Sequence, residues 1–357
     1  MSQVDPAALP PGLLPGDYPE LLAMAARIGA NSSLVQGPGG NVSVKDGGVM
    51  WIKASGTWLA HALVKPIIVP VALEPLLAGL KAGDPDCESC VSFVRSDLNP
   101  SGLRPSIETS VHAVMPQRVV IHCHDVETIA WAARADAREA LEPVLKGLPW
   151  AFVPYVKPGL SLSQAMQPAV AGGARVIILG NHGPVVAGDT VAEAERLLGD
   201  VVSRLKRPVR DAAPPQTEHL RRLARNTSYE PPENPAFHRV GTDPVSLKAA
   251  LGGSLYPDHV IFLGPSIVAL QDGETIAEAA ARANRPTLPL IVVPGAGVLI
   301  DKDATAATRA LALCISDVTA RLGAEQPLHY IGAANEAALL DWDAEKYRQS
   351  LDRAAQA

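Results

Sequence analysis

The stretch from Glu108 to Asp125, ETSVHAVMPQRVVIHCHD, constrains the fold more than any other part of the chain. Its second half, RVVIHCHD, is apolar and β-branched before it turns polar, which predicts a buried strand over residues 118–123. Successive side chains of a strand point to opposite faces, so we expect His122 and His124 on the same face, about 6.5–7 Å apart. At that separation two ring nitrogens can reach one metal ion.

A third histidine, His182, follows a second apolar segment, RVIILG. Three neutral imidazoles with an open fourth position are a recurring arrangement at catalytic zinc sites. An HxH pair alone is weak evidence, because His112 and five other histidines lie outside the pattern. The ordered set of ExxxH, HxH on a strand and NHG after a second strand is specific. We therefore predict a site for Zn²⁺, or another divalent cation, at His122, His124 and His182.

Length and charge narrow the class of protein. At 357 residues the chain exceeds the size at which single cores stop growing, roughly 250–300 residues, so two domains are expected. A net charge of −6 and an aromatic content of 4% argue against nucleic-acid binding. No apolar run reaches the ~18–20 residues of a membrane span, and the N-terminus has an acid and prolines where a signal peptide needs a basic start. We expect a cytoplasmic protein that acts on a small molecule, without a nucleic-acid or membrane partner.

The four cysteines do not form the framework of a disulfide-rich protein. Cys87 and Cys90 form a single CxxC, and without a second pair a loop with two thiols is the better interpretation. Cys123 lies between the two strand histidines, so its side chain is expected on the opposite, packed face. None of these thiols is predicted to be a metal ligand.

Strand and helix patterns alternate along the whole chain. We expect a catalytic domain over residues 1–215, a linker over 216–236 that is rich in Pro, Arg and Asn, and a smaller C-terminal α/β domain over 237–357. In that domain HVIFLGPSIVAL predicts one or two strands. Its Gly-x-Gly at residues 295–297 does not continue to a third glycine, which excludes a dinucleotide-binding fingerprint.

Short segments before Glu108 are candidates for binding an anion. Gly40 and Asn41 end a glycine-rich run whose backbone N–H groups can approach an oxyanion, although a tight turn is the better interpretation of that run alone. Ser55 and Gly56 form a second candidate contact. Ser106 either caps the helix that carries Glu108 and His112 or donates to a ligand.

Six segments of the chain resemble the class II aldolase/adducin family: GGNVSVK, WIKASGTWL, RPSIETSVH, VVIHCHD, PYVKPG and LGNHGPVVAG, in that order over about residues 20–205. Later segments are similar to the aldolase portion of bifunctional rhamnulose-phosphate aldolase/dehydrogenases, and we expect no room for the dehydrogenase half. The resemblance implies a three-layer α/β/α domain with a mixed, mostly antiparallel sheet. It also implies a homo-oligomer, with a tetramer favoured.

The same resemblance implies the chemistry of a class II, zinc-dependent aldehyde-lyase. Three histidines hold the metal, and Glu108 acts as acid/base with a pKa raised by a dry site. The reaction is retro-aldol carbon–carbon cleavage through a metal-stabilised enediolate, on a small sugar phosphate or hydroxy-keto acid. Tyr155 matches a tyrosine that, in fuculose-phosphate aldolase-type enzymes, reaches a neighbouring subunit's site as proton donor.

The sequence departs from the family at the positions that hold the substrate's phosphate, which we call the anion end of the site. The phosphate-holding positions match Gly40-Asn41, Ser55-Gly56 and Ser106, but Ile107 replaces a second serine. An epimerase, a dehydratase or a decarboxylase can use the same metal site, and the adducin branch shows that a non-catalytic binding module is a further alternative. Catalysis is favoured, since a module freed from it has no need of three histidines and a carboxylate together.

Overall fold

The computed structural model describes residues 14–354, so most of the N-terminal segment that argues against a signal peptide lies outside the described residues. The chain divides into two compact units: residues 1–125 with 141–205 form unit 1, and residues 126–140 with 206–357 form unit 2. Within the described part, no helix combines the length and the apolar character needed to cross a membrane.

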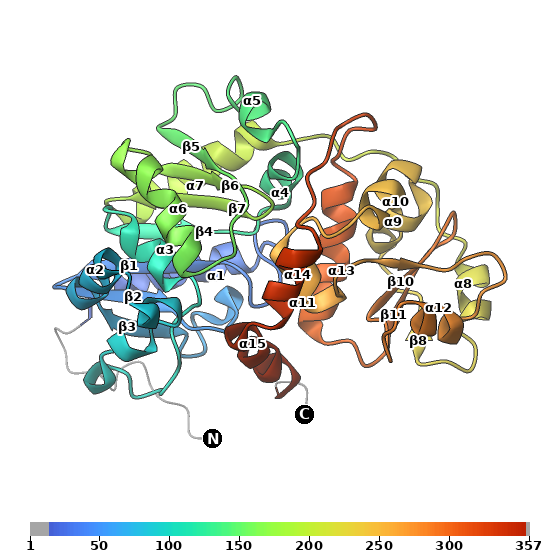
Figure 1. Ribbon diagram of the computed structural model, residues 1–357, viewed down its shortest axis with the longest axis horizontal. Coiled ribbons are helices and arrows are strands. Elements are labelled where there is room, and N and C mark those ends of the chain that lie inside the picture. The colour runs from blue at the N-terminus through green and yellow to red at the C-terminus, as the bar shows by residue number, and fades with distance from the viewer. Residues whose placement is uncertain (1–13, 355–357) are drawn as a thin grey trace. The chain divides into compact units, whose positions relative to one another are not determined.

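Unit 1 is built on a seven-stranded sheet with the order β3-β2-β1-β4-β7-β6-β5 (Figure 1). Its strands are β1 (Asn41–Asp46), β2 (Val49–Lys53), β3 (Ile68–Ala72), β4 (Val119–His122), β5 (Trp150–Val153), β6 (Val176–Leu179) and β7 (Gly183–Gly188). Every neighbouring pair is antiparallel except β5 and β6, which are parallel. The predicted mixed, mostly antiparallel sheet is confirmed.

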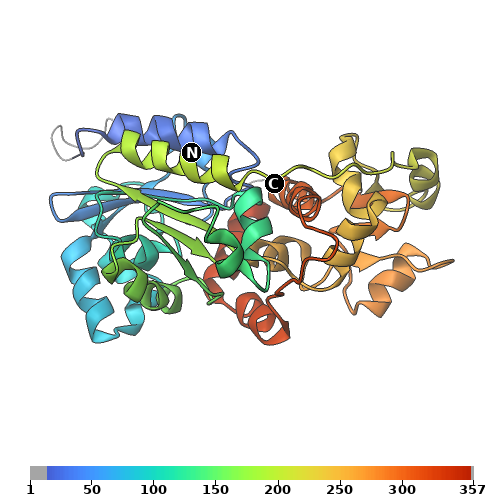
Figure 2. The same ribbon diagram turned by 90° about the horizontal axis from the view of Figure 1, so that it is seen from above.

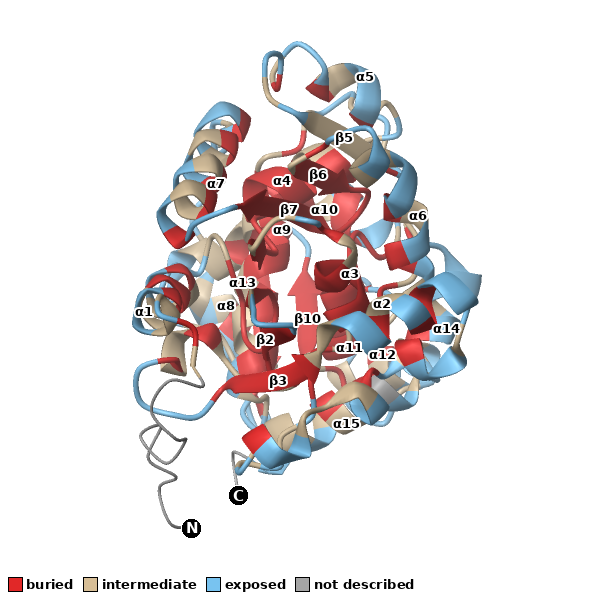
Figure 3. Cartoon of the chain, turned by 90° about the vertical axis from the view of Figure 1, so that its left-hand side faces the viewer, coloured by how far each residue is buried: buried red, intermediate tan, exposed pale blue. Residues whose placement is uncertain are grey.

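Helices cover both faces of this sheet. They are α1 (Tyr18–Gly29), α2 (Leu73–Ala82), α3 (Thr109–Val114), α6 (Leu160–Ala171) and α7 (Val191–Leu205). Helix α5 (Ala137–Leu141) belongs to unit 2 except for its last residue. The blue α1 and yellow-green α7 lie side by side on one face, and α2, α3 and α6 pack on the other (Figure 2). Helix α7 repeats its buried residues every three or four positions, which gives one apolar stripe toward the sheet. Strands β2, β6 and β7, enclosed between the helices, are buried throughout (Figure 3).

The register of the central strands brings one end of each of β1, β4 and β7 to the same edge of the sheet. In the antiparallel pair β1–β4, Asn41 lies opposite His122, and in β4–β7, His122 lies opposite Val185. The C-terminal end of β4 therefore lies between the N-terminal ends of β1 and β7. His182 immediately precedes β7, so it is placed at the same edge as His122.

Unit 2 has its own four-stranded sheet with the order β8-β11-β10-β9. Its strands are β8 (Tyr229–Glu230), β9 (Val268–Ala269), β10 (Leu290–Val293) and β11 (Gly297–Asp301). Its helices are α4 (Val126–Ala132), α8 (Thr217–Leu223), α9 (Arg239–Thr242), α10 (Pro244–Leu251), α11 (Pro257–Leu263), α12 (Ile276–Arg282), α13 (Ala306–Thr319), α14 (Ala333–Leu340) and α15 (Asp343–Ala354). The core between this sheet and its helices includes Leu220, Ile291 and Leu299.

Two segments of unit 2 differ from the sequence-based expectation. The segment expected as a linker, 216–236, contains α8 and β8, and both contribute buried side chains to the core through Leu220 and Tyr229. HVIFL forms most of helix α11, whereas the second half of the same segment contains β9, so one of the one or two predicted strands is present. Every residue of α11 is buried, so its apolar run shows no periodicity that separates helix from strand.

Gly183, the first residue of β7, has no room for a side chain. A Cβ atom there would lie 2.0 Å from the backbone oxygen of Cys123. We predict that Gly183→Ala lowers the free energy of unfolding by about 1–3 kcal/mol or more, because backbone must move to accept it. Gly199→Ala is the control, since nothing lies within 4 Å of a Cβ at that exposed position of α7. It should stabilise the helix by about 0.5–1 kcal/mol. Chemical denaturation measures both, and equal stability of the two variants would contradict the predicted clash.

Candidate metal centre

Four side chains converge at this edge of the unit 1 sheet. Glu108 immediately precedes α3, His122 ends β4, His124 follows it, and His182 lies in the turn between β6 and β7. Their potential ligand atoms all lie within 4.8 Å of one another. Each residue is buried, with 0–5% of its surface exposed. The structure thus brings together the three predicted ligands and the predicted acid/base.

The three imidazoles face one another through the nitrogens that a metal ion needs. The Nε2 atom of His182 lies 3.4 Å from that of His122 and 3.2 Å from that of His124. Two nitrogens bound tetrahedrally to zinc at about 2.0–2.1 Å are separated by roughly 3.3–3.4 Å, so these spacings suit one shared ion. His122 Nδ1 lies 3.0 Å from the carbonyl oxygen of Pro184, and donating a proton there leaves the Nε2 lone pair for the metal.

Glu108 sits against the imidazoles as an ionised carboxylate. Its Oε2 is 3.4 Å from His122 Nε2, and its Oε1 is 3.5 Å from His182 Nε2. Burial opposes ionisation of Glu108. The nearby imidazoles, of which His122 has the largest effect, and the amide of Asn41 together outweigh burial and lower the pKa of Glu108 to about 2. The expectation of a raised pKa is therefore wrong, because the carboxylate is dry but close to groups that favour its negative charge.

The cysteines take no part in this centre. Cys123 is fully buried between the two histidines in sequence, and burial raises the pKa of its thiol. Cys87 and Cys90 are buried free thiols that pack in the core formed by α2, β2 and β3.

The predicted anion-binding positions lie next to the metal centre. Gly40 has φ +61°, and a Cβ there would lie 2.9 Å from the backbone oxygen of His122, so only glycine fits without strain. The amide of Asn41 donates to Ser106 Oγ at 3.2 Å. Ser106 Oγ also accepts from the backbone N–H of Glu108, which is the N-cap residue of α3. The helix has no side-chain cap, so the capping alternative is wrong and Ser106 stabilises the turn before the helix.

Ser55 and Gly56 follow the end of β2, beside the segment that leads to Glu108. The backbone N–H of Ser55 donates to the carbonyl of Arg104, and Gly56 adopts φ +72°. Lys53, at the end of β2, is 2% exposed, and its Nζ donates to the carbonyl of Pro38, which lies within the glycine-rich run. A buried lysine side chain therefore accompanies the candidate anion site.

Of the two predicted catalytic residues, Glu108 belongs to the four-residue cluster and Tyr155 does not. Tyr155 lies in the loop after β5, where its backbone nitrogen would be 2.7 Å from a Cβ at Gly180.

Sequence reasoning missed the contacts of Ser43 and His112, which bond through Asn41 to Glu108. The available signal was the alternation of β1, which puts Asn41 and Ser43 on the same face.

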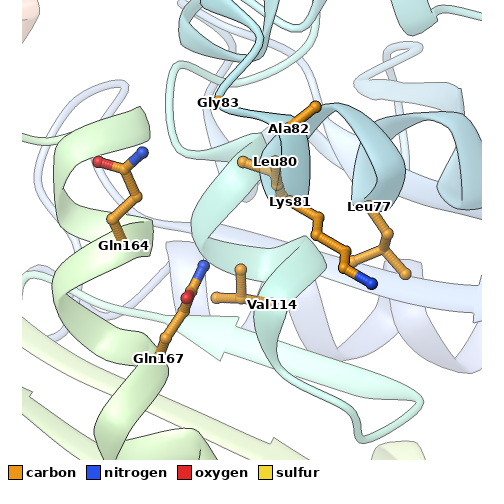
Figure 4. Close-up of a pocket in the computed structure, with 8 residues that line it drawn as sticks. All are labelled: Leu77, Leu80, Lys81, Ala82, Gly83, Val114, Gln164 and Gln167. Atoms are coloured by element: carbon orange, nitrogen blue, oxygen red, sulfur yellow. The ribbon is translucent and has the colours of Figure 1, made fainter.

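A surface hollow of about 710 Å³ lies elsewhere in unit 1, between α2, α3 and α6 (Figure 4). It is lined by Leu77, Leu80, Lys81, Ala82, Gly83, Val114, Gln164 and Gln167. This lining contains none of the predicted site residues, so the hollow is separate from the metal centre.

Residues 20–203 match the family described as the class II aldolase and adducin N-terminal domain. The chain belongs to this family. It is similar to the N-terminal class II aldolase domain of a conserved protein from Thermoplasma acidophilum, with 26% identity, a TM-score of 0.46, and coverage of 56% of this chain and 96% of that one. It is also similar to L-fuculose-1-phosphate aldolase from Thermus thermophilus, with 20% identity, a TM-score of 0.36, and coverage of 53% and 90%.

A curated relative has a different description. The protein from Bacillus subtilis (strain 168) named "uncharacterized oxidoreductase YuxG" is 27% identical over 214 residues, which are 54% of this chain and 31% of that protein. The chain therefore matches less than a third of that relative's length. The family matches the segment that contains all four residues of the centre, and these residues fit a divalent cation.

The geometry predicts that metal retention depends on each of the three imidazoles. Purified wild-type protein should carry about one divalent ion per chain, and His182→Ala should lose most of it on dialysis because two imidazoles and a carboxylate bind less tightly. His219→Ala, in α8 of unit 2, is the matched control and should keep the metal. Elemental analysis of the three proteins measures this, and equal metal in wild type and His182→Ala would contradict the assignment.

Proposed function

We propose that this class II aldolase family member is a metal-dependent aldolase, which cleaves and forms a carbon–carbon bond in a small sugar phosphate or hydroxy-keto acid. The observation that carries the proposal is the ionised, buried Glu108 beside three converging imidazoles. A carboxylate so placed can exchange a proton with a substrate carbon bound at the centre. A purely structural zinc site instead fills all four positions with protein ligands and commonly includes cysteine.

Each residue has a distinct part in this reaction. His122, His124 and His182 would hold the ion, which would supply Lewis acidity toward the oxygens of the bound substrate. In the condensation direction, Glu108 takes a proton from the carbon next to the carbonyl, and the electron pair moves onto the neighbouring oxygens. That carbon then attacks an aldehyde. In cleavage the hydroxyl of the departing fragment gives its proton to the group that protonates the alkoxide in condensation. The carbon–carbon bond then breaks, the fragment leaves as an aldehyde, and Glu108 delivers a proton to the donor carbon.

The other reactions that suit this site differ in the step after bond cleavage or proton transfer. An epimerase rejoins the same fragments, a dehydratase expels a hydroxyl, and a decarboxylase releases carbon dioxide. A binding module in the manner of adducin needs no proton carrier. The burial of Glu108 among the imidazoles therefore favours an enzyme, and the products of turnover separate the reactions from one another.

Proton exchange tests the proposal even while the aldehyde is unidentified. Dihydroxyacetone phosphate, dihydroxyacetone, glycolaldehyde and pyruvate, incubated separately with enzyme in D₂O, cover phosphorylated and free donors. We expect the protein to exchange the α-hydrogen of one of them, seen as loss of its ¹H NMR signal. Glu108→Gln should slow this exchange by about 10²–10⁴-fold and keep the metal.

The control for that experiment is Glu20→Gln, which changes an exposed carboxylate on α1. It should exchange the donor at the wild-type rate. Full exchange by Glu108→Gln, or exchange of no donor by metal-loaded wild type together with no cleavage of ketose phosphates, would refute the aldolase proposal.

We propose further that the protein works as a homo-oligomer in which Tyr155 protonates the new alkoxide in a neighbouring subunit's site. The proposal extends the family resemblance of PYVKPG to this chain. Glu108→Gln and Tyr155→Phe should each be nearly inactive in carbon–carbon bond formation. Refolding the two together should restore part of the turnover, because a mixed oligomer contains sites with both groups intact. A monomer by light scattering, or no recovery in mixed oligomers, would contradict it.

A further inference from the structure

A line of hydrogen-bonded side chains leads away from Glu108 through Asn41 and His112 to Ser43. Asn41 Nδ2 donates to Glu108 Oε2 at 2.9 Å. The Oδ1 atom of the same amide contacts His112 Nε2, and His112 Nδ1 lies 2.7 Å from Ser43 Oγ. Each of these four residues is at most 4% exposed, so no bulk water competes for their hydrogen bonds.

The direction of each hydrogen bond follows from the carboxylate end. The amide nitrogen of Asn41 donates to both Glu108 Oε2 and Ser106 Oγ, so the amide oxygen, which only accepts, faces His112. His112 Nε2 must then carry a proton. Burial lowers the pKa of His112 well below its usual value, so the ring is neutral and Nδ1 is bare. Ser43 therefore donates its hydroxyl proton to Nδ1, and every donor in the line points toward Glu108.

The line distinguishes the two oxygens of Glu108. Oε2 accepts from Asn41, whereas Oε1 is buried without a hydrogen-bond partner among the described residues. Both oxygens lie close to an imidazole nitrogen, Oε1 at 3.5 Å from His182 Nε2 and Oε2 at 3.4 Å from His122 Nε2, so the hydrogen bond from Asn41 is what sets them apart. A buried acceptor without a partner is costly and therefore rare, and such atoms are expected where a ligand completes the site.

We propose that Ser43, His112 and Asn41 form a positioning relay that fixes the orientation of Glu108 and makes Oε1 the oxygen that carries the proton. The inference rests on the proposed proton-transfer function. In donor exchange, Oε1 takes the proton that the donor carbon loses and returns a proton to the same carbon, so the carboxylate is unchanged after each exchange. Oε2 stays bonded to Asn41 throughout, and the relay residues exchange no proton with substrate.

Ser43 is the residue that selects the tautomer. Without its hydroxyl donor, His112 is free to move its proton to Nδ1 and present a bare Nε2 to the oxygen of Asn41. Two acceptors then face each other, which favours rotation of the amide by half a turn. That rotation places the amide oxygen against the carboxylate of Glu108, and the carboxylate must move. A change at Ser43, which does not touch Glu108, is thus transmitted to the reacting oxygen.

Two variants of His112 separate positioning from simple packing. His112→Gln retains an N–H donor near the place of Nε2, whereas His112→Asn retains an amide near Nδ1 and loses that donor. Both remove a ring from the same fully buried site, so each controls for the packing defect of the other. We expect His112→Asn and Ser43→Ala to lower the kcat of donor exchange about 10–100-fold, with KM and metal content unchanged. His112→Gln should retain several times the kcat of His112→Asn.

The tautomer provides a readout that does not depend on activity. In the zinc-loaded, ¹⁵N-histidine-labelled protein, a long-range ¹H–¹⁵N spectrum distinguishes bare from protonated ring nitrogens, and the signals absent from His112→Gln belong to His112. We expect bare Nδ1 and protonated Nε2 in wild type, and loss of this single pattern in Ser43→Ala. A protonated Nδ1 in wild type, or equal kcat in the two His112 variants, would overturn the relay. If no donor exchanges at all, the proposed function fails, while the spectrum still decides the hydrogen-bond direction.

Discussion

The antiparallel pairing of β4 with β1 on one side and β7 on the other is the constraint on which the centre depends. It places the start of β1, the end of β4 and the turn before β7 at one edge, so Asn41, His122 and His182 meet although they are distant in sequence. A slip of one residue would turn His122 to the opposite face of the sheet. Gly183 keeps the β7 backbone close enough to Cys123 for this register.

Convergence of four buried polar groups has an electrostatic consequence. Imidazole lone pairs that point at one another at 3.2–3.4 Å repel unless a proton or a cation lies between them. Glu108 supplies one negative charge, and the same arrangement keeps its pKa low. Ion binding and the stability of this edge of the sheet are therefore linked, since the folded chain holds the ligands together before the ion arrives.

The sequence predicted the features that short-range geometry determines. Strand alternation is local, so it correctly put His122 and His124 on one face and Cys123 on the other. Distances between segments that are far apart in the sequence depend on the whole fold, so the sequence pattern did not predict them. The approach of His122 and His182 to Glu108 reversed the expected direction of its pKa shift, and the bonds from Ser43 through His112 became visible only once β1 and α3 were in place. Helix α11 was misjudged because a uniformly buried segment carries no periodic signal.

The side-chain amide of Asn41 is bonded both to Ser106, at the candidate anion site, and to Glu108, the proton carrier. Asn41 uses its nitrogen on Glu108 and Ser106 and its oxygen on His112, so its side chain has no capacity left for a substrate anion. Ser106 Oγ accepts from both Asn41 and the backbone of Glu108, which leaves its hydroxyl proton to be donated elsewhere. An anion bound to that proton would strengthen the oxygen as an acceptor and hold Asn41 and Glu108 more firmly. Ile107 adds no second hydroxyl here, so this single serine couples the two ends of the site.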